Sequence, residues 1–226
     1  MFRPSRPSKA LIAKKVCKRS NEVEILKLIN ATKLKSDHVI MLVDSFHGQS
    51  TNWVILPKMS SIASYLDFAP DQLQNKVTEV CRGLIKGLGF LHHLNIAHRD
   101  IKPSNLIVDK FFCLKIIDFD IAIVLEDKDE EVDEQCGTKG WIAPEVEKKM
   151  KHSPIKADQW SCGYVILYLL GEFRIDHRLL RANARRLKDH NPDQRPALLD
   201  LPYSLLSTSV VSKPTRLRIE DDGEIM

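Results

Sequence analysis

The chain has 226 residues, of which 43% are hydrophobic, and a formal net charge of +4 at pH 7. These values are ordinary for a globular protein with a sizeable core, and the charge is too balanced to indicate a nucleic-acid partner. The five cysteines are dispersed without a C-x-x-C pair, which favours reduced thiols in the cytoplasm or nucleus over a disulfide framework. No apolar run is long enough to span a bilayer, so no membrane partner is expected.

The hydrophobic pattern predicts short strands in the first quarter of the chain and helices afterwards. Residues 1–9 are basic and rich in proline, and we expect them to be disordered. Strands are predicted at residues 10–17, 39–46 and 53–56. Helices are predicted at residues 20–34, 60–66, 72–94, 160–173 and 177–188. From Pro202 onward the mixture of serine, proline and charge predicts a flexible tail.

Three glycines, Gly83, Gly87 and Gly89, interrupt the otherwise apolar helix predicted at residues 72–94. Their spacing does not match a phosphate-binding loop. Close packing of the helix against a neighbouring element is the simpler explanation, and we expect it.

A dense polar stretch lies between apolar segments in the middle of the chain. Asp100, Lys102 and Asn105 fall close together, and Asp118 follows the next apolar run. Polar residues packed this densely between two short buried strands cannot form a core, so they must line a surface. An acid can orient an attacking hydroxyl, a lysine can neutralise phosphate charge, and an amide with a carboxylate can bind Mg²⁺. These residue types favour phosphoryl transfer.

The stretch HRDIKPSN at residues 98–105, followed by Asp118-Phe119-Asp120, resembles the catalytic loop and metal-binding motif of eukaryotic protein kinases. Three later segments match the same family in order. They are residues 137–145 (end of the activation segment), residues 158–163 (start of the large buried helix) and Arg195 (partner of Glu145). The resemblance implies an α+β, two-lobed, serine/threonine-type kinase fold. A reduced N-lobe would span residues 10–56 and a mainly helical C-lobe residues 57–201.

The resemblance also implies roles for the polar residues. Asp100 would orient the hydroxyl of the substrate, and Lys102 would neutralise the charge that develops on the γ-phosphate of ATP. Asn105 and Asp118 would hold Mg²⁺.

A further group of residues would bind the nucleotide. The strand at residues 10–17 resembles the strand whose lysine contacts the α- and β-phosphates, and both Lys14 and Lys15 are candidates. The A-x-K spacing favours Lys15, whereas alignment on the paired lysines favours Lys14. Glu22 would be the partner of this lysine, or else an exposed glutamate favoured by the helix dipole. The residues expected to border or bind adenine are Leu56, Lys58 and Met59.

Three features depart from the family pattern. No G-x-G-x-x-G occurs, and the nine residues before the first strand are too few for the family's first two strands, so we expect either a truncated copy or a lineage that works without the loop. Losing two or three charge-assisted hydrogen bonds would weaken nucleotide binding by about 10²-fold or more. Asp120 stands where the family has glycine, which adds a charge and restricts the backbone. The interval between Gly163 and Arg195 is also short.

Arg99 would usually meet a charge on the activation segment. The sequence between Asp120 and Gly137 contains no serine, threonine or tyrosine, so phosphorylation there cannot supply that charge. The acidic run at residues 126–134 can supply it instead, and the residues expected to face Arg99 are Asp129, Glu131 or Asp133. The alternative is a solvated loop with no fixed contact.

The leading hypothesis is an ATP- and Mg²⁺-dependent serine/threonine protein kinase acting on an unidentified protein substrate. Lys102 favours serine and threonine over tyrosine as acceptors within this family. The alternative is a pseudokinase scaffold, which the missing strands and Asp120 favour and the retained catalytic and metal residues oppose. A small-molecule kinase is disfavoured by Ala143-Pro144-Glu145, which belongs to the protein-kinase pattern.

Overall fold

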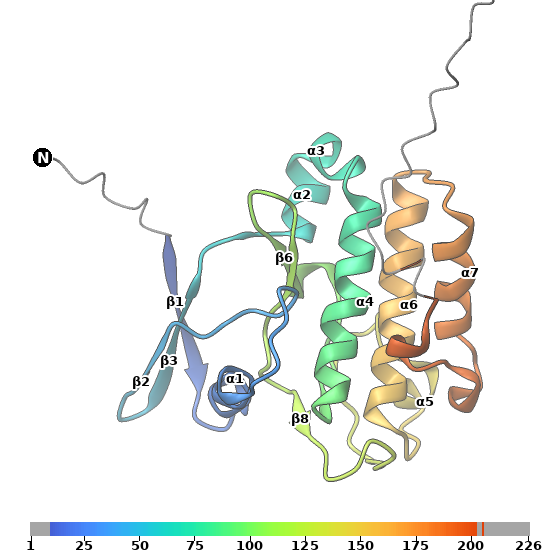
Figure 1. Ribbon diagram of the computed structural model, residues 1–226. Coiled ribbons are helices and arrows are strands. Elements are labelled where there is room, and N and C mark those ends of the chain that lie inside the picture. Colours follow the sequence, from blue (N-terminus) through green and yellow to red (C-terminus); the bar gives the residue numbers. More distant parts are fainter. Residues whose placement is uncertain (1–9, 203–204, 206–226) are drawn as a thin grey trace, which may run out of the picture.

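The computed structural model describes residues 10–202 and Leu205 (Figure 1). The predicted disordered N-terminus and nearly all of the predicted tail therefore lie outside the described residues. The described chain is a mixture of helices and strands, and the predicted α+β class is confirmed. Within it, no helix has both the length and the apolar character needed to cross a membrane.

The N-terminal part is built around a three-stranded antiparallel sheet. β1 (Leu11–Cys17) and β2 (Asp44–His47) both pair with the central β3 (Thr51–Pro57). Among the described residues, β1 has a partner along one edge only. Because side chains alternate along a strand, Lys14 shares a face with the buried Val16, whereas Lys15 points to the exposed face.

Helix α1 (Glu22–Ala31) lies beside this sheet, and its start is tied to a distant segment (Figure 1). Ser20 Oγ accepts a hydrogen bond from the Glu22 N–H (3.1 Å) at the start of the helix. The same hydroxyl donates to Asp120 Oδ1 (2.9 Å), and Asn21 Nδ2 donates to the Ala122 carbonyl (3.1 Å). These bonds hold the buried Glu22 against residues 118–122. The helix ends at Ala31, three residues before the predicted end at Leu34.

The C-terminal part is mainly helical, and α4, α6 and α7 run side by side in Figure 1. Its helices are α2 (Ile62–Phe68), α3 (Pro70–Gln74), α4 (Val77–His93), α5 (Pro144–Glu147), α6 (Pro154–Glu172) and α7 (Arg178–Leu187). The described residues of this part also form the short 3₁₀ helices η1 (Pro103–Asn105), η2 (Pro192–Gln194) and η3 (Leu198–Asp200). α6 is buried along most of its length, as its nearly continuous apolar sequence predicts.

Short strands position the polar residues of the middle of the chain. β4 (Ser60–Ser61), β6 (Leu106–Val108) and β7 (Leu114–Ile116) form one sheet in the order β4-β6-β7. β5 (Ile96–Ala97) and β8 (Ile123–Val124) form a second, two-stranded sheet. Residues 98–105 directly follow β5, and Asp118 lies two residues beyond β7. Both polar segments are therefore held at the ends of buried strands.

Two glycines allow helices to approach their neighbours closely. A Cβ atom on Gly87 of α4 would lie 2.5 Å from the His38 carbonyl oxygen. One on Gly163 of α6 would lie 2.6 Å from the Ala184 carbonyl oxygen of α7. Any larger residue would force these elements apart, because protein interiors leave no room for such overlaps. The expectation that glycines in α4 mark close packing is confirmed.

Two predicted elements are wrong in part. Residues 39–43 are not a strand: Val39 forms an isolated bridge to Ile116, and the Asn30 side chain bonds both backbone groups of Leu42 (2.8 and 3.3 Å). The Asn30 amide takes the place of a neighbouring strand at Leu42, and the regular pairing with β3 begins at Asp44. The helix predicted at residues 72–94 is divided into α3 and α4 by a turn in which Lys76 bonds the Leu73 carbonyl (2.8 Å).

Helix α6 begins six residues before the predicted start at residue 160. Ser153 Oγ accepts a hydrogen bond from the Lys156 N–H (3.4 Å), which makes Ser153 the N-cap. Pro154 takes the first helical position, where a missing N–H is not needed. This serine–proline pair is the sequence signal that apolar periodicity alone overlooks.

Candidate active site

One buried carboxylate holds the polar loop after β5 through hydrogen bonds to its backbone. Asp158 of α6 is 1% exposed and accepts hydrogen bonds from the backbone N–H groups of His98 (2.7 Å) and Arg99 (2.8 Å). Arg99 adopts a left-handed backbone with φ of 69°. Such a conformation persists only where surrounding contacts hold it, and these two bonds do so. The loop therefore presents Asp100 in a fixed orientation.

Asp100 is the centre of a compact network of side chains. Its Oδ2 accepts a hydrogen bond from Asn105 Nδ2 (2.9 Å) and lies 2.8 Å from Lys102 Nζ. Its Oδ1 accepts a hydrogen bond from the Thr138 hydroxyl (2.6 Å), which in turn accepts one from Lys102 Nζ (2.6 Å). The structure thus brings together three residues that the sequence analysis selected. Thr138 was missed, although it lies in the segment recognised as the end of the activation segment.

The network determines the charge of Asp100. Burial by itself would raise the pKa of this carboxyl, but the hydrogen bonds from Lys102, Thr138 and Asn105 outweigh burial and leave the pKa below its ordinary value. Asp100 is therefore ionised at neutral pH. A carboxylate held in this state can accept a hydrogen bond from an approaching hydroxyl and orient it.

A second cluster gathers around the ammonium group of Lys14. Lys14 Nζ lies 2.6 Å from Glu22 Oε2, 2.6 Å from Asp118 Oδ1 and 3.6 Å from Asp120 Oδ1. The preference for Lys15 as the partner of Glu22 is wrong. The reason is strand alternation, because Lys15 lies on the exposed face of β1 and points away from α1.

Three carboxylates surround one ammonium group in this cluster, and the pKa values of Glu22 and Lys14 both depart from their ordinary values. Burial raises the pKa of Glu22 to about 7, even though Lys14 acts in the opposite direction. Burial would lower the pKa of Lys14, but its hydrogen bonds to Asp118 and Glu22 prevail and raise it. One oxygen from each of Glu22, Asp118 and Asp120 can be chosen so that all lie within 4.8 Å of one another. Such a set of hard oxygen ligands suits a divalent cation.

The backbone strain expected at Asp120 does not occur in the described residues. The residue with positive φ in this motif is Asp118 (φ 70°), and Asp120 is absent from the positive-φ positions. The Phe119 side chain between them is fully buried, with its ring centroid 5.2 Å from that of His98. Replacing glycine by Asp120 therefore changes the local charge without requiring a forbidden conformation.

Asn105 links the two clusters. Its side-chain nitrogen donates to Asp100, and its backbone carbonyl accepts a hydrogen bond from the Ile117 N–H (3.0 Å), next to Asp118. His98 Nε2 lies 2.9 Å from the Ile117 carbonyl, which adds a second tie. Since the amide nitrogen of Asn105 faces Asp100, its amide oxygen is the atom that can face a metal ion beside Asp118.

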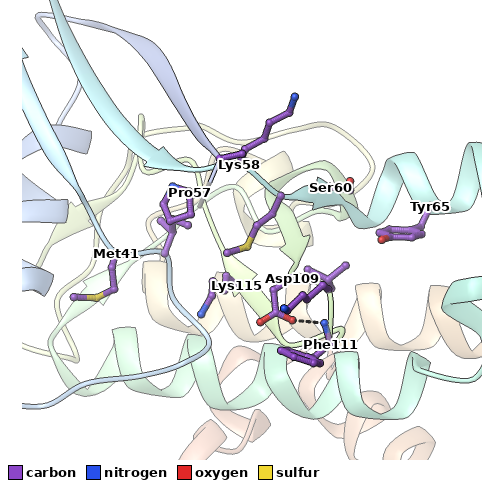
Figure 2. Close-up of a pocket in the computed structure, with 13 residues that line it drawn as sticks. Met41, Pro57, Lys58, Ser60, Tyr65, Asp109, Phe111 and Lys115 are labelled. Atoms are coloured by element: carbon purple, nitrogen blue, oxygen red, sulfur yellow. Dashed lines mark hydrogen bonds between the residues drawn. The ribbon is translucent and has the colours of Figure 1, made fainter. Parts of the chain in front are cut away.

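One pocket of the described chain lies beside Lys58 and Met59, which are the hinge residues expected to bind adenine (Figure 2). It has a volume of about 670 Å³, and its lining includes Pro57, Lys58, Met59 and Lys115. Lys14, Glu22, Asp100 and Asp118 do not line it. We assign the chemistry to the charged clusters, because none of their residues lines this pocket. Leu56 is 4% exposed and belongs to the core beside the hinge.

The activation segment meets Arg99 through a different acid from those predicted. Arg99 Nη2 lies 2.6 Å from Glu134 Oε2, and Arg99 Nε donates to Cys136 Sγ (2.8 Å). The assignment to Asp129, Glu131 or Asp133 is wrong. The segment is extended here, and Val132 forms a bridge to His152. Because side chains alternate along an extended segment, Glu134 and Cys136 lie on the same side and both contact Arg99.

Arg195 and Glu145 form a buried ion pair. Arg195 contacts Glu145 through two hydrogen bonds (2.5 and 2.9 Å), and both side chains are almost inaccessible to solvent. The predicted pairing of these two residues is confirmed. A bidentate arginine–carboxylate pair of this kind ties the end of the activation segment to the C-terminal helices.

Comparisons with known proteins agree with this geometry. A family model described as "Protein kinase domain" matches residues 6–199. The chain is 33% identical over 198 residues to "Serine/threonine-protein kinase grp" of Drosophila melanogaster, covering 83% of this chain and 38% of that protein. It is 31% identical over 140 residues to the "Phosphorylase b kinase gamma catalytic chain, liver/testis isoform" of Bos taurus, covering 59% of this chain and 34% of that protein.

A third relative is "CBL-interacting protein kinase 16" of Oryza sativa subsp. japonica, 42% identical over 92 residues, or 40% of this chain and 20% of that protein. The chain thus matches between 20% and 38% of the length of these three curated relatives. The family model covers most of the chain, and the catalytic loop has the geometry described above. On this evidence, the chain belongs to the protein kinase family and is related to serine/threonine protein kinases.

Proposed function

We propose that the chain transfers the γ-phosphate of Mg-ATP to serine or threonine hydroxyls of a protein substrate. The observation that carries the proposal is the network around Asp100. An ionised carboxylate, a lysine and a threonine hydroxyl meet there within hydrogen-bond distance. A scaffold would need none of these groups to be retained in a mutually bonded arrangement.

Each residue has a distinct part in the proposed reaction. Asp100 orients the acceptor hydroxyl and takes up its proton as the oxygen bonds the γ-phosphorus, and the bond from that phosphorus to the bridging oxygen breaks to release ADP. Lys102, already 2.8 Å from Asp100, neutralises the charge that develops on the transferred phosphoryl group. Thr138 holds Asp100 and Lys102 at a constant separation. Lys14, oriented by the buried Glu22, pairs with the α- and β-phosphates.

The residues present fit a magnesium ion. Asn105 offers an amide oxygen and Asp118 a carboxylate, of which Lys14 engages only Oδ1. Bound Mg²⁺ would supply positive charge to the phosphate oxygens. Asp120 adds a third oxygen ligand close to Asp118, and it bonds Ser20 in the present arrangement.

The pseudokinase scaffold remains the second candidate, and one observation favours it. Lys14 is surrounded by three carboxylates, so a triphosphate must compete with strong existing partners for its ammonium group. Binding of nucleotide without transfer would then be the biochemical property of the chain.

The two candidates predict different results for Mg-ATP binding and phosphate transfer. For the kinase, Mg-ATP raises the melting temperature, and the chain phosphorylates a generic protein substrate. Asp100→Asn keeps the stabilisation and lowers transfer by about 10²-fold or more, because it removes the proton acceptor. Asp118→Asn loses the magnesium-dependent part of the stabilisation. Stabilisation without transfer in the unmodified chain supports the scaffold.

The two adjacent lysines supply a matched control. Lys14→Met should abolish the stabilisation by Mg-ATP, whereas Lys15→Met, on the opposite face of β1, should leave both binding and transfer unchanged. Equal effects of the two substitutions would show that Lys14 has no particular role with the nucleotide.

A further inference from the structure

A second cavity opens directly beside the catalytic loop. It has a volume of about 240 Å³, and we call it the aromatic pocket. Its lining residues come from α2, the catalytic loop, the activation segment and α6: Ala63, Leu66, Asp67, Lys102, Pro103, Ser104, Trp141 and Tyr168. The sequence analysis assigned no role to this set apart from Lys102.

The aromatic wall of the pocket is held rigidly. The ring of Trp141 meets Tyr168 edge-on (centroids 5.5 Å apart, 87°) and Tyr164 edge-on (5.2 Å, 88°). The Trp141 carbonyl accepts a hydrogen bond from the Ser161 hydroxyl of α6 (2.8 Å). Edge-to-face aromatic pairs add stability beyond the area they bury, so this wall is preorganised. A preorganised wall loses little conformational entropy when a ligand binds.

The position of the pocket relates it to the reaction. Lys102 lines the pocket, and its Nζ lies 2.8 Å from Asp100 Oδ2 and 2.6 Å from the Thr138 hydroxyl. Neighbouring Cα atoms in a peptide are about 3.8 Å apart, so a peptide whose hydroxyl meets Asp100 can place a nearby side chain in the pocket.

The chemistry of the lining indicates what that side chain is. Most of the wall is apolar or aromatic: Ala63, Leu66, Pro103, Trp141 and Tyr168. Asp67 is the one acid in the lining of this pocket, and it is exposed at the end of α2. An arginine in the pocket would meet the like charge of Lys102, and an ion pair with the exposed Asp67 would contribute little. An apolar side chain carries no charge that must be removed from water, and it gains burial against Trp141 and Tyr168.

We propose that the aromatic pocket binds a large apolar side chain (leucine, methionine or phenylalanine) that flanks the phosphorylated serine or threonine of the protein substrate. This inference rests on the proposed kinase function and names the substrate class for the same site. Tyr168 and Trp141 are the specificity-determining residues.

The test uses synthetic peptides with one central serine in which a single flanking position carries leucine, phenylalanine, alanine or arginine. Binding to the full chain is measured by calorimetry, and phosphate transfer is measured in parallel. At one flanking position, the leucine and phenylalanine peptides should bind about tenfold more tightly than the alanine peptide. Tighter binding of the arginine peptide, or equal binding of all four, overturns the inference.

Two tyrosines on α6 allow a matched comparison. Tyr168→Ala removes a pocket wall and should abolish the preference for leucine over alanine while leaving the alanine peptide unaffected. Tyr164→Ala removes the other edge contact of Trp141 without belonging to the pocket lining, so it should keep the preference. Tyr168→Glu places a carboxylate in the wall and should shift the preference toward arginine. A merely structural role for Tyr168 would weaken all peptides alike.

The binding readout separates the two proposals. If the apolar preference appears without any transfer, the kinase proposal fails, and the pocket stands as a binding site for an apolar side chain of a protein partner. If transfer occurs with no preference at any flanking position, the pocket assignment fails and the kinase proposal stands.

Discussion

The side chain of Glu22 shows how much a single residue depends on its surroundings. It is fully buried at the first turn of α1, where Lys14 is its ion-pair partner. Removing a charged carboxylate from water is costly, and this cost raises its pKa from the ordinary 4.5 to about 7. A polar residue at the start of a helix is usually an exposed one, so its burial here is a property of the folded chain.

This pKa predicts how stability changes with pH. A carboxyl whose pKa is higher in the folded than in the unfolded chain binds more protons when folded. Its contribution to the free energy of unfolding is therefore largest below pH 4.5 and is lost as pH rises toward about 7. Urea unfolding at several pH values should show this loss, and Glu22→Gln should remove it.

Glu24 provides the control for that experiment, because it lies on the same helix and is exposed. Glu24→Gln should leave the pH dependence of unfolding as it is in the unmodified chain. If Glu22→Gln and Glu24→Gln give the same profile, the buried carboxyl does not titrate in the way described.

At the scale of elements, α4 links the helical part to the rest of the molecule. Its face toward residue 38 carries Gly83 and Gly87, and the β7 strand packs on the same helix. The segment at residues 38–40 in turn bonds β7, since Ile40 N–H donates to the Ile116 carbonyl (3.0 Å). Close contact between α4 and this segment therefore helps to hold β7, and with it Asp118, in position.

A pair of glycine substitutions tests this packing. Gly87→Ala would place a Cβ 2.5 Å from the His38 carbonyl and should lower the free energy of unfolding by about 1–3 kcal/mol. Gly171→Ala in α6 meets no atom within 4 Å and should be neutral or stabilise by up to about 1 kcal/mol. Chemical denaturation measures both. Equal destabilisation would contradict the packing argument.

For the whole molecule, the activation segment connects distant parts of the chain. It contacts the catalytic loop through Glu134 and Arg99, and the C-terminal helices through Glu145 and Arg195. The first contact is made by the carboxylate of a glutamate and not by a phosphate group, so the segment is held without modification. Glu134 is 72% exposed, and an exposed ion pair of this kind contributes about 0.2–1 kcal/mol.

Glu134→Gln should therefore free the segment and lower the rate of phosphate transfer severalfold, while the melting temperature changes little. Asp129→Asn makes the same charge change on the same segment without contacting Arg99 and should leave the rate unchanged. Trypsin cleavage at Lys128 should become faster only in Glu134→Gln. An unchanged rate and unchanged cleavage in that variant would contradict the proposal that the Glu134–Arg99 ion pair holds the activation segment in place.

Much of the candidate site was accessible from the sequence because its chemistry is contiguous. Asp100, Lys102 and Asn105 fall within one loop, and the carboxylate of Asp118 follows at a recognisable interval. The α+β class and the pairing of Glu145 with Arg195 also followed from ordered motifs, and the structure agrees with both.

Other features depend on contacts between residues far apart in the chain, which local patterns do not contain. Lys14 and not Lys15 pairs with Glu22, because Lys14 lies on the inner face of β1. Glu134 and not its acidic neighbours contacts Arg99, in the segment that Val132 bridges to His152. Thr138 joins Asp100 only because the activation segment folds back onto the catalytic loop.

The sequence by itself determined which chemical groups are available at the candidate site, because residue types and their short spacings are properties of the local sequence. The tertiary structure decided which of several equivalent groups occupies each place, because strand register, helix packing and long-range hydrogen bonds choose among neighbours of the same charge.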